Sequence, residues 1–133
     1  MTEGTLAIAR LAKEAAEEVK AQDIVILDMR RVTLVTDYFV IATGTSRPQI
    51  QAMADRIKEK VEGAGTKLLH SEGLANAKWV LMDFGAVVVH IFGRVERDFY
   101  HLERLWGDAP VIEGGERRNE GHNEGRVLTM PDS

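Results

Sequence analysis

The most apolar stretch of the chain runs from Trp79 to Phe92 and predicts two short strands joined by a tight turn. The strands are expected over residues 79–82 and 87–92, with residues 83–86 turning between them. Asp can bond its own backbone and Gly adopts positive φ at little steric cost, so both suit a turn. Because the run does not alternate cleanly between polar and apolar residues, we expect helices on both faces of these strands. One buried helix is the rival interpretation, which the β-branched residues and Gly85 disfavour.

Apolar residues at helical spacing predict three helices. The first covers residues 2–22, and the second begins after Ser46 and ends at Gly63. Ser46 and Gln49 form a candidate capping box for the second helix. The third covers residues 94–106, with Arg97 mostly outside its apolar stripe. The residues of this helix that are expected to face inward are Val95, Phe99, Leu102, Leu105 and Trp106.

Further strands are predicted over residues 23–29, 38–43 and 66–70, followed by a loop over residues 71–77. With the hairpin, these give an α+β fold, a single mixed sheet of about five strands packed with helices. The segment 107–133 has five glycines, six acidic residues, three arginines and few large apolar groups. Such a segment buries too little surface to offset its ordering entropy. We therefore expect one domain over residues 1–106 and a flexible acidic Gly-rich tail over residues 107–133.

Composition narrows the class of protein. The 133 residues are 44% hydrophobic, enough for one core, and include no cysteine, which excludes disulfides and cysteine-based zinc sites. The net charge of −4 disfavours a broad basic face for RNA or DNA and favours a basic protein partner. No segment has the length and polarity of a membrane span or a signal peptide. A soluble cytoplasmic protein is expected, with no DNA or membrane partner.

The candidates for catalysis each have a simpler structural explanation. Residues 44–46 (Gly-Thr-Ser) follow a strand and open a helix, where backbone N–H groups can hold phosphate, but the capping box already explains them. Asp37 and Asp83 could bind metal or act as bases, yet no D-x-D or D-x-E occurs on a predicted strand. His90 lies in an apolar strand without a second metal-ligating residue at the usual spacing. We therefore expect no cofactor, no metal and no catalytic residue.

Two aromatic residues of the hairpin are candidates for an interface. Trp79 begins a strand after a loop, where it is as often exposed as buried. Phe84 lies at the turn, where a large apolar group has few neighbours from its own chain. Exposed Trp and Phe side chains are strong anchors in protein interfaces.

Several segments of the chain form a specific combination, although no single one is specific alone. They are Asp23-Ile24, Thr36-Asp37-Tyr38-Phe39-Val40-Ile41, Thr43-Gly44-Thr45-Ser46, Gly73, Trp79-Val80-Leu81-Met82-Asp83-Phe84-Gly85, Val88-Val89-His90-Ile91-Phe92, and Arg97-Asp98-Phe99-Tyr100 with Leu102-Glu103 and Leu105-Trp106. This combination, from about Leu6 to Trp106, resembles the ribosomal silencing factor family, also called the Iojap-like family.

The resemblance implies a nucleotidyltransferase-like fold without catalysis. It also implies binding to the large ribosomal subunit through its ribosomal protein number fourteen, which blocks subunit joining and represses translation under nutrient limitation. Carried over by position, the contact surface centres on Trp79, Asp83 and Phe84. Many members have an acidic residue where this chain has Ala86, which is expected to weaken pairing with a basic partner.

Three hypotheses follow. The first is a ribosome-binding module that prevents subunit association. The second is a nucleotidyltransferase-like enzyme that binds a Mg-nucleotide, with residues 44–46 on phosphate and Asp37 or Asp83 on metal. The third is a homodimer in which the exposed hairpin serves self-association.

Overall fold

The computed structural model describes residues 2–100 and 109–113. In chain order, the helices and strands are α1 (Thr2–Glu18), β1 (Gln22–Asp28), β2 (Tyr38–Gly44), α2 (Arg47–Gly63), β3 (His70–Glu72), β4 (Trp79–Asp83), β5 (Val87–Gly93), α3 (Arg94–Tyr100) and β6 (Val111–Glu113). The six strands form one mixed sheet in the order β3-β4-β5-β2-β1-β6, in which only β2 and β5 pair in parallel. The predicted α+β fold is confirmed.

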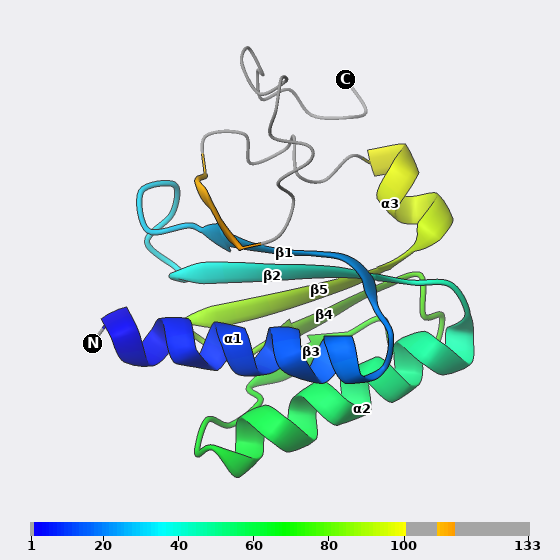
Figure 1. The fold of residues 1–133 in the computed structure, drawn as a ribbon, viewed down its shortest axis with the longest axis horizontal. Coiled ribbons are helices and arrows are strands. Elements are labelled where there is room, and N and C mark those ends of the chain that lie inside the picture. Colours follow the sequence, from blue (N-terminus) through cyan, green and yellow to red (C-terminus); the bar gives the residue numbers. More distant parts are fainter. Residues whose placement is uncertain (1, 101–108, 114–133) are drawn as a thin grey trace.

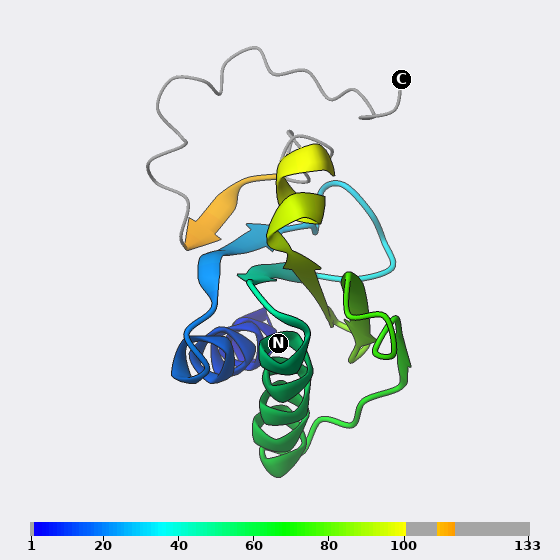
Figure 2. The ribbon, with the colours of Figure 1, turned by 90° about the vertical axis from the view of Figure 1, so that its right-hand side faces the viewer.

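Two long helices cover one face of this sheet, and the short α3 lies on the other side (Figures 1 and 2). The core between the sheet and the two helices joins alanines of α1 and larger apolar residues of α2 to side chains of β2, β4 and β5. The small alanine side chains let α1 approach the sheet closely. A second, smaller cluster on the opposite face contains Val25, Leu27, Ile41 and Phe92.

The N-terminus of α2 also fastens the end of α1. The Ser46 side chain accepts a hydrogen bond from the Gln49 N–H at 3.2 Å, as the capping-box prediction requires. The Gln49 side-chain oxygen accepts from the N–H of Thr45 at 2.6 Å, rather than from that of Ser46. Its amide nitrogen donates to the carbonyls of Val19 and Lys20, where α1 has ended. One glutamine therefore caps α2 and holds the α1–β1 connection.

Two strands differ from the sequence prediction because their pairing is not local. β3 covers His70–Glu72 instead of residues 66–70, since its register is set by antiparallel pairing with β4. β6 lies inside the segment predicted as a flexible tail, and it pairs with the outer edge of β1. Residues 111–113 therefore belong to the sheet. Residues 114–133 lie outside the described part, and the predicted boundary at residue 106 stays a prediction.

The side of α3 that packs on the sheet is not the side that the sequence predicts. Val95, which we expected to face inward, is 74% exposed, whereas Arg97 is 4% exposed. The Arg97 guanidinium donates to the Thr43 hydroxyl at 2.6 Å, in a buried contact near the carboxyl end of β2. A long arginine stem packs like an apolar chain when its charged end is hydrogen-bonded. The rest of the predicted helix, with Leu102, Leu105 and Trp106, lies outside the described residues.

Thr43→Val is expected to destabilise the protein by about 2 kcal/mol, because a buried guanidinium N–H loses its acceptor. Thr43→Ser keeps the hydroxyl and is expected to stay within about 0.5–1 kcal/mol of the parent. Urea unfolding followed by circular dichroism measures both. Equal stability of the valine variant and the parent would show that this hydrogen bond adds nothing to folding.

Candidate functional site

Trp79 lies at the start of β4, on the face of the sheet away from α1 and α2. Its indole ring packs on Phe92 with ring centroids 4.9 Å apart, and its N–H donates to His90 Nδ1 at 3.1 Å. The residue is still 40% exposed. Trp79 therefore combines a fixed orientation with a partly exposed apolar ring, as an interface anchor requires.

Strand pairing places further side chains on this face. In antiparallel strands, directly opposed residues point to the same side of the sheet. Trp79 is opposite Phe92, Leu81 is opposite His90, and Asp83 is opposite Val88. The parallel register adds Phe39, which pairs with Val88. We call the exposed and half-buried members of this set the open face: Phe39, Trp79, Leu81, Asp83 and Val88.

Asp83 gives the open face a negative charge. One carboxylate oxygen, Oδ1, accepts a hydrogen bond from the Gly85 N–H at 2.7 Å and so stabilises the hairpin turn. Gly85 has φ of 94°, which favours glycine, and the Phe84 N–H closes the turn on the Val87 carbonyl at 2.9 Å. The second oxygen, Oδ2, has no hydrogen-bond partner among the described residues and can meet a cation of a partner.

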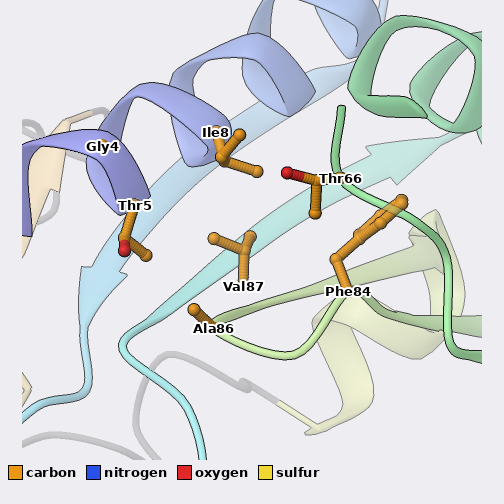
Figure 3. A pocket seen from close by; sticks show the side chains of 7 residues that line it. All are labelled: Gly4, Thr5, Ile8, Thr66, Phe84, Ala86 and Val87. Atoms are coloured by element: carbon orange, nitrogen blue, oxygen red, sulfur yellow. The ribbon is translucent and has the colours of Figure 1, made fainter. Parts of the chain in front are cut away.

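Phe84 is not part of the open face. It is 5% exposed and belongs to the core on the helix side of the sheet, so the expectation of an exposed ring at the turn is wrong. Its ring borders an open hollow of about 320 Å³, which the N-terminal part of α1 and the hairpin also line. Figure 3 shows the side chains around this hollow. Successive residues of an extended chain point to opposite faces, which turns Phe84 away from the side of Asp83.

The buried His90 side chain lies next to Trp79 and accepts its indole hydrogen bond. Its ring stands at 65° to the Phe39 ring at a centroid distance of 4.6 Å, and it is parallel to Phe92 at 6.1 Å. Burial lowers the pKa of His90 to about 4, so the imidazole is neutral at pH 7. Because Nδ1 accepts the indole hydrogen bond, the ring proton is on Nε2. The sequence predicts His90 as a strand residue that binds no metal, but it predicts neither its burial nor its contact with Trp79.

The residues needed for a nucleotidyltransferase site are not brought together. Gly44 ends β2, whereas Asp37 directly precedes this strand, so the candidate phosphate corner and Asp37 are roughly 20 Å apart. Asp83 lies at the same end as Asp37, because its partner Val88 pairs with Phe39. The Thr45 N–H at the corner is already bonded to Gln49. Among the described residues, no group of three His, Asp or Glu side chains could hold a metal ion.

None of the helices in the described part of the chain has the length and hydropathy of a membrane span.

Three members of the open face were missed from the sequence: Phe39, Leu81 and Val88. The signal for Leu81 was present, since residues 79, 81 and 83 alternate along one strand. Val88 joins this face through its pairing with Asp83 in the β4–β5 hairpin. Phe39 reaches it through the parallel pairing of β2 with β5, which local sequence does not reveal.

Comparison with known proteins gives a consistent family. The family model described as "Ribosomal silencing factor during starvation" matches residues 2–129. A protein of Bacillus subtilis named ribosomal silencing factor RsfS is 45% identical over 106 residues, covering 80% of this chain and 90% of that protein. The Arabidopsis thaliana protein named Iojap, chloroplastic, is 39% identical over 109 residues, which cover 82% of this chain and 45% of that longer protein.

Solved structures agree with the fold. A crystal structure of a Chromobacterium violaceum protein is 40% identical and superposes with a TM-score of 0.74, covering 77% of this chain and 85% of that one. A Bacillus halodurans structure, also 40% identical, gives a TM-score of 0.69 and covers 78% of this chain and 94% of the other.

Proposed function

The chain belongs to the ribosomal silencing factor family, and from this premise we propose that it binds the large ribosomal subunit and blocks joining of the small subunit. The partner on the subunit is its ribosomal protein number fourteen, and the outcome is repression of translation in the cytoplasm when nutrients are scarce. The family names support silencing of ribosomes. The choice of protein fourteen rests on the resemblance to the family from about Leu6 to Trp106.

One observation carries the proposal for the site. A half-exposed tryptophan and a carboxylate with an available oxygen lie on the same open face. Trp79 offers apolar area that is already oriented, and Asp83 offers charge to a basic partner. Leu81 lies between them on β4, Val88 lies opposite Asp83 on β5, and both extend the apolar part of the contact. Phe84 supports the turn from the core side and is not proposed as a contact.

Trp79→Ala and Asp83→Arg are each expected to weaken binding to isolated large subunits by at least about 30-fold, the loss for a hot spot of ~2 kcal/mol. Sucrose-gradient sedimentation with separated subunits measures binding, and a light-scattering assay of subunit joining measures the consequence. The same variants should also lose binding to purified ribosomal protein fourteen.

The controls change similar chemistry elsewhere on the molecule. Leu34→Ala removes a fully exposed apolar side chain from the β1–β2 loop, and Asp55→Arg reverses an exposed charge on α2. Both should bind like the parent. If Trp79→Ala and Asp83→Arg co-sediment as well as these controls, the open face is not the ribosome-binding surface.

Self-association through the open face is a separate proposal, because the same apolar area could pair two copies. A homodimer of this kind would compete with ribosome binding, so the two states would be linked by protein concentration. Static light scattering of the parent and of Trp79→Ala distinguishes a dimer through this face from a monomer.

A further inference from the structure

The side chain of Trp79 is held in place by His90. The indole N–H donates to Nδ1 of a histidine that is itself 4% exposed, at 3.1 Å. Phe39 and Phe92 flank the imidazole, at centroid distances of 4.6 and 6.1 Å, and limit its rotation. An exposed tryptophan ordinarily donates its N–H to water or to a partner. Here the protein supplies the acceptor from its own core.

The backbone of Trp79 is packed closely against Gly73. A Cβ atom on Gly73 would lie 2.1 Å from the Trp79 carbonyl oxygen, a distance that real Cβ atoms do not adopt. Gly73 also has φ of 88°, and its carbonyl accepts from the Ala77 N–H at 2.9 Å to close the loop before β4. The Lys78 carbonyl then accepts from the Gly93 N–H at 3.0 Å, which fixes the start of β4 against β5.

From these contacts we propose that His90 and Gly73 are positioning residues, which hold the Trp79 indole in the one orientation that presents its ring face to the ribosomal partner. The inference rests on the proposed function of the open face. Because the indole N–H is satisfied internally, the partner needs no acceptor for it when the surface is buried. The partner's contribution at this point is therefore an apolar side chain, or a cationic one that stacks on the ring.

Preorganisation explains why the arrangement favours affinity. A side chain that is already confined to one rotamer loses less entropy on binding than one that is free to rotate. Removing either restraint should thus weaken binding even though neither His90 nor Gly73 contacts the partner. It should weaken binding less than removing the ring itself.

The direct test is NMR of the isolated protein labelled with ¹⁵N. The chain has two tryptophans, and Trp79→Phe identifies the indole signal of Trp79. We expect a scalar coupling across the hydrogen bond from Trp79 Nε1 to His90 Nδ1 at pH 7. His90 should show the nitrogen shifts of a neutral ring protonated on Nε2. Absence of the coupling in the parent overturns the role of His90 while the open face can still bind.

The binding test uses pairs of variants. His90→Phe keeps an aromatic ring without the acceptor and is expected to weaken large-subunit binding about tenfold. His90→Asn places an amide oxygen close to the position of Nδ1 and is expected to restore binding to within about threefold of the parent. Equal binding by His90→Phe and the parent overturns the proposal.

Gly73→Ala and Gly65→Ala test the backbone restraint. Both glycines have positive φ, of 88° and 102°, but a Cβ on Gly65 meets nothing within 4 Å. Gly73→Ala should shift the Trp79 indole signal and weaken binding about tenfold or more, whereas Gly65→Ala should change neither. If both variants bind alike, Gly73 has no positioning role. Normal binding by Trp79→Ala would contradict the proposed function of the open face. The NMR coupling is measured on the isolated protein, so it tests the present inference separately.

Discussion

Phe84→Ala is expected to lower the free energy of unfolding by about 3 kcal/mol, because it removes a buried ring from the core. This loss is at the lower end of the range for replacing a buried phenylalanine by alanine. The ring borders an open hollow of about 320 Å³, so part of the space left behind is continuous with solvent. Chemical unfolding of the variant and the parent measures the difference.

The same position separates a core role from a binding role. Phe84→Leu keeps most of the apolar volume and should stay folded, at a cost of roughly 1–2 kcal/mol. Because Phe84 lies in the core on the helix side of the sheet and not on the open face, this variant should bind large subunits like the parent. If folded Phe84→Leu loses binding while Leu81 and Asp83 are intact, the side chain reaches the partner after all, and the hairpin must rearrange on binding.

The hairpin is the part of the fold that local sequence determines best. Its strands were predicted within one residue at their ends, and the turn uses both the Asp83 side chain and the positive φ of Gly85 as expected. These features depend on residues that are neighbours in the chain. The start of α2 is similar, since the Ser46 cap is a contact between residues three apart.

The sheet edges and α3 could not be predicted in this way. β3 and β6 are three residues each, and their existence depends on the free edges of β4 and β1. Val95 and Arg97 exchange their expected environments because the contact with Thr43, more than fifty residues earlier, sets the rotation of α3. Long-range pairing decides such features, and a local apolar pattern does not contain it.

Only part of the candidate site could be predicted, because the rest depends on pairing between strands. Trp79 was singled out by its place at a strand end and Asp83 by the family resemblance alone, and the alternation along β4 places both on one face. Phe84 was predicted at the interface from its place at the turn and from the family resemblance, but a turn position does not determine the face to which the ring points. His90 was predicted only as a strand residue without a metal, and its hydrogen bond to Trp79 depends on the register between β4 and β5.

The buried imidazole of His90 is expected to make the protein less stable in mild acid. Its folded-state pKa is about 4, below the usual 6.5, because burial disfavours the charged ring. Between these values the unfolded chain binds the proton and the folded chain does not, so stability falls as the pH falls through this window. From pH 7 the loss from His90 alone should reach about 2 kcal/mol at pH 5 and about 3 kcal/mol at pH 4.

His90→Asn isolates this contribution, because its amide does not titrate while the carboxylates of the chain remain. The difference in unfolding free energy between pH 7 and pH 5 should therefore be about 2 kcal/mol smaller in the variant than in the parent. Urea unfolding at both pH values measures it. Equal acid sensitivity in the two proteins would mean that the ring accepts a proton while folded. The imidazolium would then have lost Nδ1 as the acceptor for Trp79, so the positioning of the indole would be lost over the same pH range.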